Sequence, residues 1–138
     1  MAIFPKRQRK LSLRTLTGLY QSGNVLFHHP YKLFYLIHPT PPSARSESKI
    51  VISVPKRNFK RAIDRNRIKR QIREAFRLNS STLNQELKAH NMQIELLCLY
   101  LPHAHTPTSL LSNKMESLLA RLAQLVALAH VAPASGVD

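Results

Sequence analysis

A strand, a loop and a helix can be read from residues 50–76, IVISVPKRNFKRAIDRNRIKRQIREAF, and this stretch constrains the fold most. The β-branched run at residues 50–54 predicts a strand, which Pro55 ends because proline has no N–H to donate to a sheet. Residues 61–77 then change to helical spacing. The apolar residues of that helix fall on one side: Ile68, Ile72, Ala75 and Phe76. The stretch therefore predicts a helix that packs on a sheet through one face.

The opposite side of the predicted helix is cationic. Its members are Asn66, Lys69, Arg70, Arg73 and Arg77. Residues 56–77 hold ten Lys or Arg against two acids, Asp64 and Glu74, which we expect to pair with neighbouring arginines. Because a solvated face normally mixes both signs, this excess of one sign indicates a polyanionic partner. The net charge of +14 is typical of proteins that bind RNA, DNA or an acidic membrane.

Residues 65–70, RNRIKR, and residues 72–76, IREAF, resemble the signature of the bacterial ribonuclease P protein subunit. Eleven helix positions agree with that family in type and order, and a weaker likeness runs from about Leu11 to Val126. The preceding Ser-Val-Pro-Lys-Arg is similar to the family's basic connection between strand and helix. Two features depart from the pattern: Asn58-Phe59-Lys60 replaces a frequent glycine, and Gln93 replaces a frequent acid.

The resemblance implies a subunit of a ribonucleoprotein enzyme. In that enzyme the RNA removes the 5′ leader of precursor tRNA with bound Mg²⁺, and the protein has no catalytic residue or metal site. The expected partners are one ribonuclease P RNA and precursor tRNA, in the cytoplasm. Residues expected to bind the RNA are Arg65, Asn66, Arg67, Lys69, Arg70, Arg73 and Arg77. Residues expected to bind the leader are Tyr20, Phe34, Tyr35, Lys56 and Arg57.

The aromatic residues of the leader set follow from strand and helix patterns. Phe34 and Tyr35 must point to opposite faces of a strand, so one of them should face outward. If that residue lay beside the basic helix it would be a stacking platform, and the sequence leaves open which of the two it is. Tyr20 matches an aromatic position of the family's leader cleft, whereas Leu16 departs from it.

The residues themselves indicate binding rather than catalysis. With three Gly and seven acids, the chain shows no phosphate-cradling loop, no close carboxylate pair and no nucleophile–base pair with an orienting group. His103 and His105 form an H-x-H pair without an acid or Cys nearby in the sequence, which favours a surface loop over a metal site. Cys98 stands alone in an apolar run, which favours a buried thiol in a reducing compartment.

The remaining patterns predict a single α/β (α+β) domain, a two-layer sandwich with helices mostly on one side of one sheet. The predicted order is helix 12–22, strand 31–38, strand 50–54, helix 61–77, strand 93–101 and helix 109–129, with room for an extra short strand. The strand at 93–101 is apolar enough to be buried on both faces. The resemblance implies a left-handed βαβ crossover, against the general right-handed preference.

The connections and ends complete the domain plan. Residues 39–49, rich in Pro and Ser, are expected to join two antiparallel neighbours, and residues 82–91 to form one or two helical turns. Residues 1–10 are interpreted as a flexible basic arm, 11–130 as one RNA-binding domain and 131–138 as a flexible tail.

Three other functions compete with this hypothesis. A general RNA-binding or ribosome-associated protein could use the same basic face. A DNA-compacting protein is less favoured because the sequence shows no helix-turn-helix or dimerisation stripe. A peripheral membrane protein is also less favoured, since the helix needs its apolar stripe for the core, and no run reaches the ~20 apolar residues that span a bilayer.

Overall fold

The structure is a computed structural model that describes residues 24–131 of the 138-residue chain. The predicted arm at 1–10, the predicted helix 12–22 with Tyr20, and residues 132–138 of the predicted tail lie outside the described residues. The elements are β1 (Val25–His28), β2 (Tyr31–Pro39), β3 (Ser48–Ser53), α3 (Ala62–Asn79), α4 (Ser81–His90), β4 (Met92–Tyr100) and α5 (Thr108–Val131).

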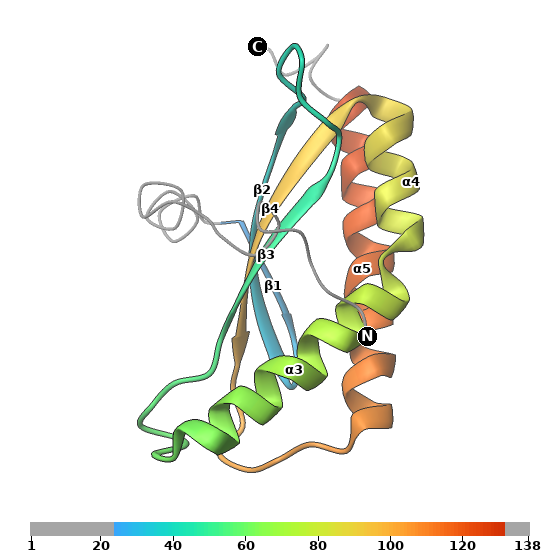
Figure 1. Ribbon diagram of the computed structural model, residues 1–138. Helices are drawn as coiled ribbons and strands as arrows, with labels where there is room; N and C mark the ends of the chain where they lie inside the picture. Colours follow the sequence, from blue (N-terminus) through green and yellow to red (C-terminus); the bar gives the residue numbers. More distant parts are fainter. Residues whose placement is uncertain (1–23, 132–138) are drawn as a thin grey trace.

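The four strands form one sheet in the order β1-β2-β4-β3. β1 pairs antiparallel with β2, β2 pairs antiparallel with β4, and β3 pairs parallel with β4. Helices α3, α4 and α5 all lie on one side of this sheet (Figure 1). The predicted two-layer α+β architecture is thus confirmed, and β1 is the extra short strand. The β3–α3–α4–β4 unit joins two adjacent parallel strands; its left-handedness stays a prediction.

Two local predictions were wrong. Residues 39–49 do not join neighbouring strands, because β4 lies between β2 and β3. β4 is buried at seven of its nine positions, all except Glu95 and Leu99, and a strand that is buried on both faces is most stable in the sheet interior. Residues 81–90 form a full ten-residue helix, since Leu83 and Leu87 supply a completely buried apolar side.

The core lies between the sheet and the helices. The four apolar residues predicted for the inner side of α3 are all buried, none of them more than 3% exposed: Ile68, Ile72, Ala75 and Phe76. They pack in one cluster with alternate residues of β2, β3 and β4 and with the inner side of α5. The hydroxyl of Tyr31 donates a buried hydrogen bond of 2.9 Å to the Leu111 carbonyl, which ties β2 to α5.

The single cysteine belongs to this core. Cys98 is fully buried, as predicted, and burial raises the pKa of its thiol to about 12. A thiol that stays protonated at neutral pH and has no access to solvent is a poor nucleophile. Cys98 therefore acts as a small apolar residue.

The two isoleucines at opposite sides of α3 test this packing. We expect Ile72→Ala to lower the free energy of unfolding by about 2–5 kcal/mol, because Ile72 is completely buried and the truncation leaves a cavity. Ile63→Ala is the matched control: Ile63 is 65% exposed, so the change should be within about 0.5 kcal/mol. Urea denaturation of both variants measures the difference. Equal losses would contradict the orientation of α3.

Candidate nucleic-acid interface

The rotation of α3 decides which of its side chains face outward. Residues along an α-helix follow one another by about 100°, so burying Ile68, Ile72, Ala75 and Phe76 turns the opposite side outward. That side carries Asn66, Lys69, Arg70, Arg73 and Arg77, which we call the cationic stripe. Asn66, Arg70 and Arg77 are exposed, while Lys69 and Arg73 are half-buried. The predicted stripe therefore exists as a continuous surface on one helix.

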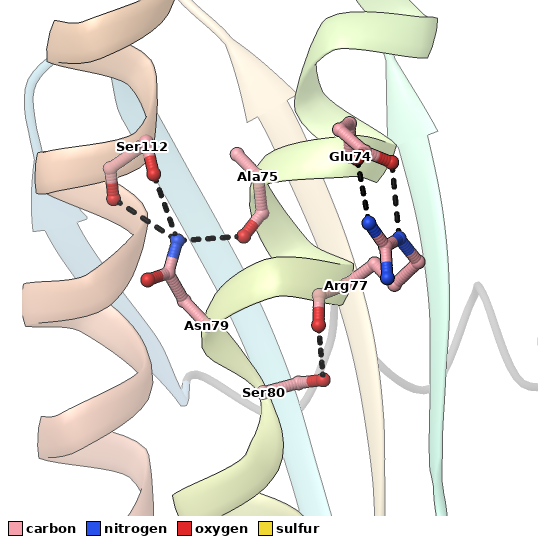
Figure 2. Close-up of polar contacts among 6 residues, drawn as sticks. All are labelled: Glu74, Ala75, Arg77, Asn79, Ser80 and Ser112. Carbon is pink, nitrogen blue, oxygen red and sulfur yellow. Dashed lines mark hydrogen bonds and ion pairs between the residues drawn. The ribbon is translucent and has the colours of Figure 1, made fainter. Parts of the chain in front are cut away.

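Arg77 of the stripe forms an ion pair with an acid of its own helix. Its Nε and Nη2 donate to the two carboxylate oxygens of Glu74 at 3.0 and 2.7 Å (Figure 2). The hydrogen bond from Arg77 lowers the pKa of the Glu74 carboxyl, and the same bond raises the pKa of Arg77. The predicted pairing of Glu74 is thus confirmed. The remaining positive charge of the stripe comes from Lys69, Arg70 and Arg73.

The three consecutive residues 65–67 do not share a face, since each step along the helix turns by about 100°. Asn66 lies in the cationic stripe, and Arg67 is exposed beside it. Arg65 turns instead toward the preceding loop, where its Nη1 donates to the Phe59 carbonyl at 2.8 Å and the Lys60 carbonyl at 3.0 Å. Arg65 therefore fastens the loop to the start of α3.

That loop also has an aromatic anchor. The ring of Phe59 is 8% exposed and packs 6.0 Å from Tyr100 and 5.6 Å from His105 between ring centroids. The backbone N–H groups of Asn58 and Phe59 both donate to the Pro55 carbonyl. This loop holds the residues that depart from the pattern of the resembled family, and Phe59 is the residue that fixes the loop here. Lys56 and Arg57 remain exposed on its surface.

His105 lies near an acid that the sequence does not suggest. Its Nε2 is 3.5 Å from the Asp64 carboxylate, which is also 3.8 Å from Nε of Arg61. These pairs fit the prediction that Asp64 is a charge partner, and they place an acid next to the H-x-H pair. Among residues 24–131, no three His, Cys, Asp or Glu side chains gather in a way that could hold a metal ion.

The structure separates the two aromatic candidates of β2. Tyr35 packs against the core on the helix side, and Phe34 points to the opposite side, which we call the outer sheet face. Phe34 is thus the outward residue, but it does not lie beside the basic helix, because α3 covers the other side of the sheet. Lys32 places its Nζ 5.4 Å from the centre of the Phe34 ring. Phe34 and Tyr35 therefore cannot both contribute a ring to the same surface.

The strand register shows which residues share the outer sheet face. One row across the four strands contains Phe27, Lys32, Leu99 and Ser53, and the next contains Val25, Phe34, Leu97 and Val51. The first row lies at the end of β3 from which the loop with Lys56 and Arg57 departs. Aromatic, aliphatic and cationic side chains thus alternate along this end of the sheet, which suits unpaired bases and their phosphates.

The far end of α3 is fixed by residues that the sequence patterns do not reveal. Nδ2 of Asn79 donates to the Ala75 carbonyl at 2.8 Å and to the carbonyl and Oγ of Ser112 at 3.3 and 3.0 Å (Figure 2). Gln71 donates to Oγ1 of Thr108 at 3.3 Å. These bonds join α3 to α5 and hold the stripe in one orientation.

Comparison with known proteins agrees with this geometry. The family model described as Ribonuclease P matches residues 4–123. The chain belongs to the ribonuclease P protein family. It is accordingly a subunit of a ribonucleoprotein endoribonuclease that acts in tRNA processing. The competing function, a general RNA-binding or ribosome-associated protein, is not favoured. None of the helices within residues 24–131 is long and apolar enough to cross a membrane.

Individual relatives carry the same description. The chain is similar to the ribonuclease P protein component of Porphyromonas gingivalis, with 27% identity over 118 residues that cover 85% of each chain. The chain is also similar to the ribonuclease P protein component of Chromohalobacter salexigens, with 39% identity over 82 residues that cover 58% of this chain and 59% of that one.

Solved structures share the fold. The RNase P protein of Staphylococcus aureus superposes with a TM-score of 0.62 at 21% identity, covering 84% of this chain and 95% of that chain. The protein of Thermotoga maritima gives a TM-score of 0.64 at 18% identity, covering 83% and 97%.

The hydrogen bonds of Arg65 generate a prediction. Arg65→Ala should lower the free energy of unfolding by about 1–2 kcal/mol and speed tryptic cleavage between Lys56 and Arg61, because two loop carbonyls lose their charged donor. Arg67→Ala is the control, since Arg67 is exposed and should change stability by less than about 0.5 kcal/mol. Urea denaturation and timed trypsin digestion measure both effects. If Arg65→Ala left the rate of tryptic cleavage in the loop unchanged, the proposed role of Arg65 in fastening the loop would be refuted.

Proposed function

We propose that the cationic stripe of α3 binds the RNA subunit of ribonuclease P, and that the outer sheet face binds the 5′ leader of precursor tRNA. The observation that carries the first part is the outward orientation of Lys69, Arg70 and Arg73 on a helix whose other side is locked in the core. A rigid row of cations meets phosphates without first having to be ordered.

The residues flanking the stripe extend the proposed RNA contact. Asn66 and Arg67 are exposed next to it, and Arg77 reaches the RNA as part of its pair with Glu74. Arg65 has a double role in this proposal. Its two bonds to the loop both use Nη1, so Nε and Nη2 of the guanidinium can contact a phosphate while the loop stays in place.

The proposed leader site combines Phe34 with the loop cations Lys56 and Arg57. Phe34 supplies a half-buried aromatic side chain on the outer sheet face, and the loop at the end of β3 supplies charge for the leader phosphates. Tyr20 belongs to the proposal by its match to the family, although it lies outside the described residues. Tyr35 contributes by packing on the core behind Phe34 rather than by stacking on a base.

In this proposal the RNA subunit catalyses the cleavage. Mg²⁺ bound by the RNA subunit supplies the nucleophilic water and stabilises the leaving oxygen. The protein lowers the repulsion between catalytic RNA and precursor tRNA, so that less Mg²⁺ is needed. We expect one protein to bind one RNA subunit. The buried thiol of Cys98 suits the reducing cytoplasm in which we place the complex.

A cleavage assay tests this function. The purified protein is mixed with a bacterial ribonuclease P RNA and precursor tRNA at a Mg²⁺ concentration at which the RNA alone is inactive. We expect 5′ cleavage at the mature end only when both components are present. Cleavage by the protein alone would reveal a protein active site, and salt-sensitive RNA binding without any stimulation would favour a general RNA-binding protein.

A further inference from the structure

β1 forms one edge of the sheet, and its Phe27 is the most exposed large apolar residue within residues 24–131. Phe27 is 67% exposed, whereas Phe34 on the neighbouring strand is half-buried. Phe27 pairs with Lys32 across β1 and β2, so an aromatic and a cationic side chain are neighbours on the outer sheet face. An exposed ring beside a cation is suited to a ligand that combines a flat base with a negative charge.

A pocket opens beside Phe27, between β1 and α5. Its volume is about 230 Å³, below the roughly 300 Å³ at which sites for whole small molecules begin. The residues that line it with Phe27 are Leu26, His28, Ser117, Leu118 and Arg121. None of these described residues is acidic. The size and the charge of the pocket therefore fit a phosphate and its sugar, with room for the base only outside it.

Arg121 supplies the positive charge of this pocket. It is exposed and forms no ion pair with an acid of the described part of the chain. The backbone of β1 supplies a second donor. The N–H of Tyr35 donates to the Asn24 carbonyl, so alternate residues of β1 bond to β2, and the N–H of Phe27 points away from β2 to the edge of the sheet. Arginine and backbone N–H groups are donors of the kind that hold nucleic-acid phosphates.

We propose that the edge of β1 is a subsite for the single-stranded leader of precursor tRNA, in which one base stacks on Phe27 and the adjoining phosphate is held by Arg121 and the N–H of Phe27. This inference rests on the proposed function, because it extends the proposed leader surface from Lys32 along the same register row to the edge of the sheet. The base must be unpaired, since only an unpaired base exposes its face to an aromatic side chain. The subsite therefore adds affinity only for leaders that are long enough to reach it.

A second copy of this chain is the other occupant that an edge strand could accept. β1 has only four residues, which offer few backbone hydrogen bonds to a partner strand. Pairing two copies through β1 would also bring together two chains that each carry a net charge of +14, with Lys32 and Arg121 beside the contact. The charge at this edge therefore favours a polyanion.

The first experiment measures kcat/KM of the assembled protein and RNA subunit on precursor tRNAs whose leaders grow one nucleotide at a time. Phe27→Leu keeps an apolar side chain but removes the ring, so we expect kcat/KM to fall about ten-fold for long leaders and to stay unchanged for the shortest leader. Phe27→Tyr keeps the ring and should behave like the parent protein.

Leu78→Ala is the control for this series, because it truncates an exposed apolar residue of α3 and should leave the dependence on leader length unchanged. An equal loss of kcat/KM in Phe27→Leu at every leader length, or no loss at any length, would overturn the inference.

The second experiment tests the phosphate contact. Arg121→Gln should make the slope of log kcat/KM against log salt concentration less steep by about 0.7 for long leaders, since a contact to a single-stranded phosphate releases about that number of counterions. Lys88→Gln replaces an exposed cation of α4 and should keep the parent slope. A parent slope in Arg121→Gln would refute the contact between Arg121 and the leader.

The third experiment locates the leader. Ser117→Cys places a photoreactive label in the pocket, and the native Cys98 does not compete because it is fully buried. We expect a cross-link to one leader nucleotide, which is lost with the shortest leader. The same label on Ala89→Cys of α4 should not reach the leader. A cross-link to the RNA subunit alone, or to a second protein chain, would refute the subsite.

The two proposals can fail separately. If the parent protein does not stimulate 5′ cleavage by the RNA subunit, the proposed function fails. If the parent protein stimulates cleavage, while Phe27→Leu and Arg121→Gln leave the reaction unchanged at every leader length, only the subsite at the edge of β1 fails.

Discussion

The burial of one side of α3 against the sheet is the constraint on which the rest of the protein depends. Ile68, Ile72 and Phe76 are removed from water almost completely, and this apolar contact fixes the rotation of the helix. Because the helix cannot rotate, its other side must present Lys69, Arg70 and Arg73 outward. The cationic stripe is therefore a consequence of core packing, which orients its cations outward.

The ends of α3 add polar restraints to this apolar contact. At the start, Arg65 bonds to the carbonyls of the preceding loop, and Phe59 anchors the same loop in the core. At the other end, Asn79 bonds to Ser112 of α5. A helix held in this way along its length keeps both the stripe and the loop cations in place, which suits binding to a large and equally rigid RNA.

The local patterns of the sequence predicted much of this arrangement. The periodicity of residues 61–77 is a property of neighbouring residues, so the inner side of α3 and its cationic stripe follow from it directly. The pair of Glu74 and Arg77 also lies within one helical turn. The departure from the family at residues 58–60 could not be interpreted from the sequence, because the role of Phe59 depends on Tyr100 and His105, which come from a distant part of the chain.

Contacts between distant residues account for what the sequence did not predict. The position of β4 between β2 and β3 depends on how all four strands pair with one another, and the pattern of a single strand does not contain this information. The turn of Arg65 toward the loop depends on where the loop carbonyls lie, and the signature residues alone suggest three equivalent RNA contacts. The face of Phe34 depends on β2 register. The alternation of side chains along a strand predicted that either Phe34 or Tyr35 faces away from the helices. The packing of the sheet shows that this residue is Phe34.

The salt dependence of RNA binding tests the central claim most directly. Binding of the RNA subunit is measured over a range of salt for the parent protein, for Arg70→Gln and for Lys69→Gln with Arg70→Gln. We expect the slope of log Kd against log salt to fall by about 0.7–0.9 for each cation removed, since each releases counterions from one phosphate. Lys88→Gln on α4 is the control and should keep the parent slope. Slopes unchanged in the stripe variants would contradict the account.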